Sequence, residues 1–296
     1  MIKASDVKEL RERTGAGMMD CKKALTETNG DMEKAIDWLR EKGIAKAAKK
    51  ESRIAAEGLT EGAANDDEAI IFEVNCETDF VTKNENFQNL VKELRDALMF
   101  SKANTLEEAN EVKLKSGKTI AETIVDATAK IGEKISFRRF ERITKGKDEV
   151  FGIYSHMGGK ITSIVTLKGS DKDVARDVAM HVAAMNPISI DKDGVPEDTL
   201  NREKEVIKET IKNDEKNKNK PDDIIEKMSI GKLNKFYKEN CLVEQEFVKD
   251  SDLTVGQFVK NNDSEITNMI RYAVGEGIEK RKDDFAEEVM SQINNS

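Results

Sequence analysis

The chain has 296 residues, of which 38% are hydrophobic and 36% are charged, and its formal net charge is -9. This length predicts two or three domains with at least one substantial core. The acidic balance argues against a protein that binds the nucleic-acid backbone, because such binding requires a clustered excess of Lys and Arg. It favours proteins as partners.

The distribution of apolar residues predicts a protein that stays in the cytoplasm. No run of 18 apolar residues occurs, and the N-terminal stretch lacks the apolar centre of a signal peptide. Cys21, Cys76 and Cys241 are far apart in the sequence, and only two histidines are present. We therefore expect three buried free thiols, with no disulfide framework, metal site or cofactor.

The first fifty residues predict three short helices that form a small bundle. Ser5 or Asp6 is expected to cap the first helix and Asp31 the third, with Gly43 just beyond the end of the third. Residues 44–58 are rich in Ala and Lys and predict a solvated linker, either helical or semi-extended. A bundle of this size has a small core, so the rest of the chain or a partner is expected to support it.

A strand followed by an amphipathic helix occurs twice in the middle of the chain. "AIIFEVNCE" at 69–77 predicts a buried strand, and "NENFQNLVKELRDALMF" at 84–100 predicts a helix. A second strand and helix lie within 161–186, and a helix over 120–131 leads into a strand in "KISFRRFERI". The pattern indicates two related α+β subdomains that pack as one core.

The last third of the chain is predicted to be mainly helical. Residues 198–212 and a segment from Asp222 or Asp223 to about 240 predict two helices joined by a polar tip, hence a helical hairpin. The remaining residues predict a helix, a strand and a terminal helix.

The cysteine and histidine positions give little support to enzyme chemistry. Cys76 and His156 with Asp79 could form a nucleophilic set, but Cys76 lies within an apolar run, which favours a core thiol. His181 lies on an apolar helical stripe and is interpreted as a core histidine with satisfied hydrogen bonds.

Two glycine motifs fail the requirements of nucleotide binding. "GGKIT" at 158–162 has Tyr154 at the first glycine position of a phosphate loop, so a hairpin turn is the better interpretation. "GEGIEK" at 275–280 lacks the third glycine of a dinucleotide fingerprint. Since these motifs fail, binding rather than catalysis is the expected function.

"EVNCETDF" at 73–80 ends with an aromatic residue where the chain should turn at the surface. The residues alone favour Phe80 as a core residue at a helix entry, and Asp79 as the cap of that helix. They also place one of the adjacent residues Met18 and Met19 in the core of the first helical bundle, because two adjacent side chains cannot both face it.

Two stretches resemble the signature motifs of the elongation factor Ts family: "LRERTGAGMMDCKKAL" at 10–25 and "EVNCETDFV" at 73–81. The resemblance continues, in the family's order, through "KAAKK", "AKIGEKI", "HVAAMNP", "KFYKENCLVEQEFVKD" and "VGEGIEK". It implies an α+β fold with five parts: an N-terminal three-helix domain of the ubiquitin-associated type with its linker (1–53), a core N-subdomain (54–144), a core C-subdomain (145–196 and 236–262), an inserted helical hairpin of the dimerisation type (197–235) and a C-terminal helical module (263–296).

The resemblance also implies a function. Members of this family are guanine nucleotide exchange factors for the GTPase elongation factor Tu and are not enzymes that transform a substrate. The chain is accordingly expected to disrupt the magnesium and phosphate site of elongation factor Tu and to promote GDP release during translation. A homodimer or a two-plus-two complex is possible, and no nucleic acid, membrane or cofactor is expected.

Specific contact residues follow from the resemblance. Phe80 is expected to insert between partner side chains near the phosphate site, and Asp79 to pair with partner groups beside it. The remaining expected contacts are Thr78 and Val81 in the same motif, Arg11, Met18 and Met19 in the N-terminal domain, Ile131, Gly132 and His156 in the core, and residues 274–277.

Two other functions stay open at this point. A non-catalytic adaptor with a ubiquitin-associated-like domain would share the three-helix bundle but would not need Phe80. A hydrolase would need Cys76 and His156 to meet.

Overall fold

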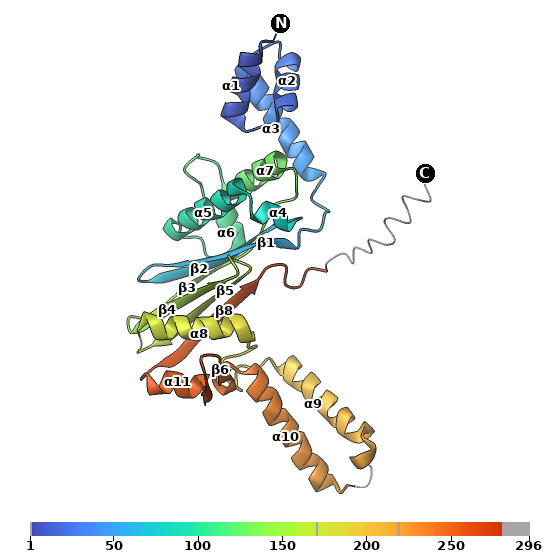
Figure 1. Cartoon of the computed structure of the whole chain (residues 1–296), viewed down its shortest axis with the longest axis vertical. Helices are drawn as coiled ribbons and strands as arrows, with labels where there is room; N and C mark the ends of the chain where they lie inside the picture. Colours follow the sequence, from blue (N-terminus) through green and yellow to red (C-terminus); the bar gives the residue numbers. More distant parts are fainter. Residues whose placement is uncertain (1, 170, 218–219, 280–296) are drawn as a thin grey trace. The chain divides into compact units, whose positions relative to one another are not determined.

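The structure is a computed structural model that describes residues 2–169, 171–217 and 220–279, and it confirms the α+β class with an N-terminal helical domain (Figure 1). The described residues divide into two compact units, one drawn from 2–61, 72–142 and 273–279 and the other from 62–71 and the described part of 143–272. None of the described helices is long and apolar enough to cross a membrane.

Three helices form the N-terminal domain: α1 (Ala4–Thr14), α2 (Met18–Glu27) and α3 (Met32–Ala48). Their shared core contains Leu10, Cys21 and Leu25, all fully buried. The Asp31 carboxylate accepts a hydrogen bond from the Lys34 N–H at 3.1 Å, which confirms it as the cap of α3.

The cap of α1 differs from the prediction. Lys3 occupies the capping position, and the Asp6 carboxylate reaches back to accept a hydrogen bond from the Lys3 N–H at 3.2 Å. Ser5 lies within the helix. An acidic residue in the first turn therefore stabilises the helix start without being the cap itself.

Helix α3 continues through Gly43, which was expected to end it. A Cβ atom at Gly43 would lie 3.2 Å from the Cβ of Ala129, so this glycine permits close packing with α7 (Ile120–Ile131) and does not stop the helix. Residues 44–48 of the expected linker are consequently helical. Strand β1 (Glu57–Ala64) begins in the last residues of that linker.

The first sheet has the strand order β1-β2-β3, with β2 spanning Glu68–Cys76 and β3 spanning Ser136–Thr144. Figure 1 shows four helices on one side of this sheet: α4 (Asp79–Thr82), α5 (Glu85–Phe100), α6 (Leu106–Asn110) and α7. Helix α5 begins at the Asn84 cap and buries one face, as its periodicity predicted; that face consists of Phe87, Leu90, Val91, Leu94 and Leu98.

The second sheet has the order β4-β5-β8 and packs against a helix. Its strands are β4 (Glu149–His156), β5 (Ile161–Lys168) and β8 (Glu265–Ala273), and the helix is α8 (Lys172–Met185). Strands β4 and β5 form the predicted hairpin, with His156 opposite Ile161 at the turn. A small pair, β6 (Glu246–Phe247) and β7 (Asp250–Thr254), and helix α11 (Val255–Asn261) complete this region.

The predicted helical hairpin consists of α9 (Glu197–Asn213) and α10 (Asp222–Asn240), which pack against each other (Figure 1). A short 3-10 turn, η1 (Glu215–Asn217), follows α9, and a second, η2 (Leu242–Glu244), follows α10. The predicted strand after α11 is β8, whereas the predicted terminal helix lies in residues 280–296, outside the described residues. The five-part domain division stays a prediction.

Candidate functional site: an exposed aromatic residue on a one-turn helix

The segment after β2 presents one aromatic ring to solvent. Helix α4 is a single turn, and its residues Val81 and Thr82 are buried, whereas Phe80 is 78% exposed. In one helical turn adjacent residues point about 100° apart, so burial of Val81 and Thr82 directs Phe80 outward. The expectation from the residues alone, that Phe80 is a core residue, is therefore wrong.

Glu133 holds the residue that precedes α4. Its Oε2 accepts a hydrogen bond from the Thr78 N–H at 2.9 Å, and its Oε1 accepts one from the Thr78 hydroxyl at 2.6 Å. Glu133 follows Gly132, which ends α7 with a left-handed backbone at φ 88°. Glu133 could not be predicted from the sequence, because no local pattern links residue 133 to residue 78.

The carboxylate of Glu77 connects the same two segments, this time as the acceptor on the side of residues 77 and 78. Glu77 Oε1 accepts a hydrogen bond from the Lys134 N–H at 2.6 Å, and the Glu77 carboxylate also lies 3.3 Å from Arg53 Nη1. Residues 77 and 78 are thus joined to residues 134 and 133 by charge-assisted hydrogen bonds, which are stronger than neutral ones. These contacts place the start of α4 at a defined position relative to the end of α7.

Asp79 and Lys83 flank the exposed ring. Asp79 Oδ2 lies 3.1 Å from Lys83 Nζ, one helical turn along, and the same Nζ lies 5.7 Å from the centre of the Phe80 ring. Thr78 occupies the capping position and Asp79 is the first helical residue, so the prediction that Asp79 is the cap is corrected. Asp79, Phe80 and Lys83 are all exposed at the surface.

Beside Phe80 the surface has a depression of about 660 Å³. Its lining includes Val81, Asp126, Lys130 and Ile131, so α4 and α7 both contribute to it. Ile131 and Gly132, two of the expected contact residues, lie at the end of α7, with Ile131 half-buried and Gly132 exposed.

The N-terminal domain presents two adjacent methionines. Met18 is 58% exposed and Met19 is 76% exposed, because Cys21 and Leu25 of the same helix fill the core. The expectation that one methionine is a core residue is therefore wrong. Arg11 on α1 is exposed too. Flexible thioether side chains at a surface suit an adaptable protein contact.

The remaining expected contacts lie elsewhere in the chain. His156 is exposed at the end of β4, where its ring centre lies 6.1 Å from that of Tyr154. In the segment 274–277, the Gly275 N–H donates a hydrogen bond to the buried Glu73 carboxylate at 2.8 Å. Arg138 and Arg139 also donate to Glu73. The backbone of this segment is therefore hydrogen-bonded to a buried carboxylate that two arginines share.

The thiols are positioned as core residues. Cys21, Cys76 and Cys241 are free and buried, as predicted. Burial raises the pKa of the Cys21 and Cys241 thiols, which disfavours the reactive thiolates. Cys76 donates to the Thr78 carbonyl at 3.1 Å, and it belongs to a different compact unit from His156.

His181 is fully buried and has partners at both ring nitrogens. Its Nδ1 accepts a hydrogen bond from the Val248 N–H at 3.3 Å, so Nε2 carries the proton and donates it to Gln245 Oε1 at 2.9 Å. Burial lowers the pKa of His181. The interpretation as a satisfied core histidine is confirmed.

Together these features define a class: an α+β protein whose exposed aromatic residue and exposed methionines suit contact with another protein. Within the described residues no group of three His, Cys, Asp or Glu side chains could hold a metal ion. The family model described as Elongation factor TS matches residues 77–276, about two thirds of the chain. The chain belongs to the elongation factor Ts family, whose members are translation factors that promote guanine nucleotide exchange on elongation factor Tu.

The match includes Thr78, Asp79, Phe80 and Val81, and also Ile131, Gly132 and His156. Arg11, Met18 and Met19 precede the matched residues.

Proposed function

We propose that this chain binds elongation factor Tu in its GDP form and accelerates GDP release by inserting Phe80 near the magnesium and phosphate site. The observation that carries the proposal is the 78% exposure of the Phe80 ring on a one-turn helix held through Thr78 by Glu133. A helix whose start is held in place before binding loses little backbone freedom when the complex forms.

Exchange requires a contact that is stronger in the nucleotide-free partner than in the loaded one. Binding energy that is equal in both states would change no equilibrium. An aromatic wedge meets this requirement, because it fills a space that is present only after the partner's phosphate site has rearranged. Asp79 stands next to the ring and is suited to pair with a basic group or a helix N-terminus of the partner.

The other contacts would provide docking. Arg11, Met18 and Met19 are exposed on α1 and α2 and would bind the GTPase domain of the partner. Ile131, Gly132 and His156 would add contacts from the core, and Thr78 and Val81 would support the wedge. The exchange reaction would take place in the cytoplasm, with one or two copies of each protein in the complex.

The test measures release of labelled GDP from elongation factor Tu by rapid mixing. We expect acceleration by the wild-type chain and a rate about thirtyfold lower with Phe80→Ala, which corresponds to a hot-spot loss of about 2 kcal/mol. Phe100→Ala is the matched control, since Phe100 is 92% exposed at the end of α5 but is not an expected contact.

Equal rates for wild type and Phe80→Ala would contradict the assignment of Phe80. Binding without acceleration by the wild-type chain would contradict exchange and support the adaptor function.

A further inference from the structure

The residues that follow α3 are bonded to their own unit, although residues 44–58 were expected to be a solvated linker. Residues 49–52 form turns: the Lys50 N–H donates to the Ala47 carbonyl and the Arg53 N–H donates to the Lys50 carbonyl, both at 2.9 Å. The chain therefore leaves the N-terminal domain as a compact stretch rather than an extended one. Such a stretch can hold its side chains in place against a neighbouring segment.

Two lysine side chains join this stretch to the tripeptide Gly132–Lys134, which follows α7. Lys50 Nζ donates a hydrogen bond to the Gly132 carbonyl, and Lys134 Nζ donates one to the Glu51 carbonyl, each at 2.5 Å. Both lysines are half-buried, and each bond has a charged donor, which makes it stronger than a neutral hydrogen bond. An ammonium group next to the end of α7 is also favoured by the negative end of the helix dipole. The linker and the tripeptide thus hold each other through reciprocal contacts.

Arg53 adds a weaker contact in the same region. Its Nη1 lies 3.3 Å from the Glu77 carboxylate, and Glu77 also accepts the hydrogen bond from the Lys134 N–H. Arg53 is exposed, so this ion pair contributes little by itself. The two lysines therefore carry most of the attachment.

The tripeptide is bonded on its other side to the start of α4. Its middle residue, Glu133, accepts both hydrogen bonds from Thr78, the residue that precedes the one-turn helix of Phe80. Its two ends bond to residues 50 and 51. Residues 132–134 therefore form a bridge between the linker and the helix that carries Phe80.

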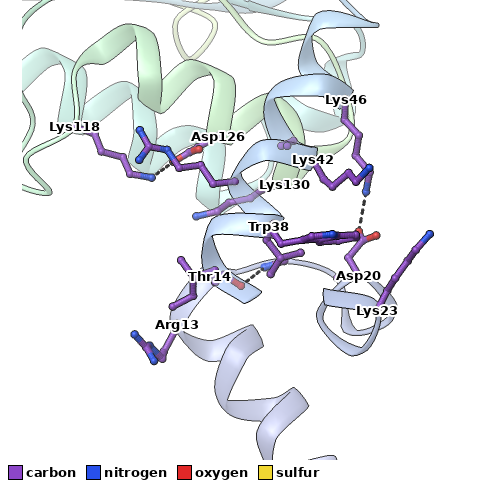
Figure 2. A pocket seen from close by; sticks show the side chains of 17 residues that line it. Arg13, Thr14, Asp20, Lys23, Trp38, Lys42, Lys46, Lys118, Asp126 and Lys130 are labelled. Carbon is purple, nitrogen blue, oxygen red and sulfur yellow. Dashed lines mark hydrogen bonds and ion pairs between the residues drawn. The ribbon is translucent and has the colours of Figure 1, made fainter. Parts of the chain in front are cut away.

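The N-terminal domain also contacts α7 along its length. A Cβ at Gly43 would lie 3.2 Å from the Cβ of Ala129, and Arg40 pairs with Glu122 at 3.1 Å. Side chains of α3 and of α7 also line the pocket shown in Figure 2. Packing thus fixes α3 against α7, and the two lysines extend this attachment beyond the end of α7 to the 132–134 bridge.

We propose that Lys50 and Lys134 are positioning residues for nucleotide exchange: they fix the 132–134 bridge, and through it the start of α4, to the N-terminal domain. Under the proposed function, on which this inference rests, the N-terminal domain docks on the GTPase domain while Phe80 enters near the phosphate site. Because the two parts are joined through the bridge, the docked domain sets where the ring is presented. A mere tether would only keep the ring at a high local concentration near the partner.

The first measurement uses the free chain and does not involve elongation factor Tu. Hydrogen exchange of the Thr78 amide is compared between wild type and the double variant Lys50→Gln with Lys134→Gln. We expect it to become at least about threefold faster, because the 132–134 bridge that holds Thr78 is released from the linker and local opening costs about 0.65 kcal/mol less. The Asn86 amide, which is capped at the start of α5, should be unchanged.

The second measurement is the rate of GDP release from elongation factor Tu as a function of the concentration of the chain. In the double variant we expect the rate at saturation to fall about tenfold, which corresponds to about 1.4 kcal/mol, and each single variant should lose about threefold. The concentration that gives half of the maximal rate should change less than about twofold, because the docking residues Arg11, Met18 and Met19 are untouched.

Three variants serve as controls. Lys50→Arg and Lys134→Arg keep a charged donor at each position and should retain most of the rate. Lys49→Gln removes the same charge as Lys50→Gln from the neighbouring exposed position. It should change neither the rate of GDP release nor the hydrogen exchange of the Thr78 amide.

Unchanged hydrogen exchange at Thr78 in the double variant would overturn the inference. So would an unchanged rate at saturation with a higher half-saturating concentration, which is the result expected of a tether. A loss with Lys49→Gln equal to that with Lys50→Gln would assign the effect to net charge and overturn it too. Absence of acceleration by wild type would overturn the proposed function and this inference together, whereas acceleration by wild type and by the double variant alike would overturn this inference alone.

Discussion

At the scale of single residues, the outward direction of Phe80 depends on its neighbours in the chain and on Glu133. Phe80 is exposed because its two neighbours, Val81 and Thr82, are buried, and α4 begins where it does because Glu133 binds both polar groups of Thr78. Glu133 is thus a positioning residue for the wedge. Removing it should loosen α4 without changing any group that enters the partner.

Glu133→Ala is therefore expected to lower the GDP release rate about tenfold, which corresponds to about 1.4 kcal/mol lost from two charge-assisted hydrogen bonds. The Thr78 amide should also exchange its hydrogen faster, which a general loss of partner affinity would not cause. Thr78→Ser keeps both donors to Glu133 and serves as the control. Unchanged release with Glu133→Ala would show that the wedge does not need this support.

His181 makes stability depend on pH. Its pKa in the folded chain is lowered by burial, whereas in the unfolded chain it is about 6.5. Below that value the unfolded chain binds a proton that the folded chain does not, so stability is fully present above about pH 6.5 and is lost as the pH falls.

We expect a lower midpoint of urea unfolding at pH 5.5 than at pH 7.5. His181 should lower the free energy of unfolding by at most about 1.4 kcal/mol for each pH unit. The difference between the two urea midpoints should be smaller in His181→Gln, because glutamine cannot be protonated in this pH range. An equal pH dependence in the variant would assign the effect to other groups.

At the scale of elements, two glycines in the second unit have opposite roles. Gly152 lies in β4 where α8 crosses it, and a Cβ there would come within 2.1 Å of the Ala175 carbonyl group. Gly231 lies inside α10, and among the described residues no heavy atom outside its own stretch of helix lies within 4 Å of the position that a Cβ would occupy there. A side chain at Gly152 would collide with the backbone of α8, so packing requires glycine there. Gly231 has no such neighbour, and its effect is only to lower the helix propensity of α10.

Gly152→Ala is expected to destabilise the second unit by about 3 kcal/mol, because backbone atoms of α8 have to move. Gly231→Ala should stabilise it by about 0.5–1 kcal/mol, the difference in helix propensity between the two residues. Thermal unfolding of both variants provides the comparison. A neutral Gly152→Ala would contradict the close packing of α8 on β4.

Elements with a strong local pattern were predictable from the sequence. Helices α5, α7 and α8 show a regular apolar face and begin at capping side chains, Asn84, Thr119 and Asp171, which accept hydrogen bonds from backbone N–H groups. Strand β1 lacks such a pattern, because its sequence "EGLTEGAA" contains two glycines and the strand depends on pairing with β2. The prediction for Gly43 was wrong because close packing against Ala129 has no local signal.

The candidate site was predictable only in part, for a similar reason. The motif "ETDF" stands out as an interruption after a buried strand, but the residues alone placed Phe80 in the core. Its outward direction depends on contacts with residues 133 and 134, more than fifty positions further along the chain. Resemblance to the family supplied the partner, which no pattern of residues could name.

At the scale of the whole molecule, the proposed function requires that two binding equilibria be coupled. If the chain lowers the affinity of elongation factor Tu for GDP, then GDP must lower the affinity of elongation factor Tu for the chain by the same factor. Phe80 is the group proposed to carry this coupling, whereas the exposed methionines of the N-terminal domain are proposed to bind both forms.

The most direct measurement is accordingly the affinity of the chain for nucleotide-free and for GDP-bound elongation factor Tu, with wild type and Phe80→Ala. We predict that the wild-type chain binds the nucleotide-free form at least about a hundredfold more tightly, a coupling of about 2.7 kcal/mol. Phe80→Ala should bring the two affinities closer, mainly by weakening binding to the nucleotide-free form. Equal affinity of the wild-type chain for the two forms, or an unchanged ratio in Phe80→Ala, would contradict the account.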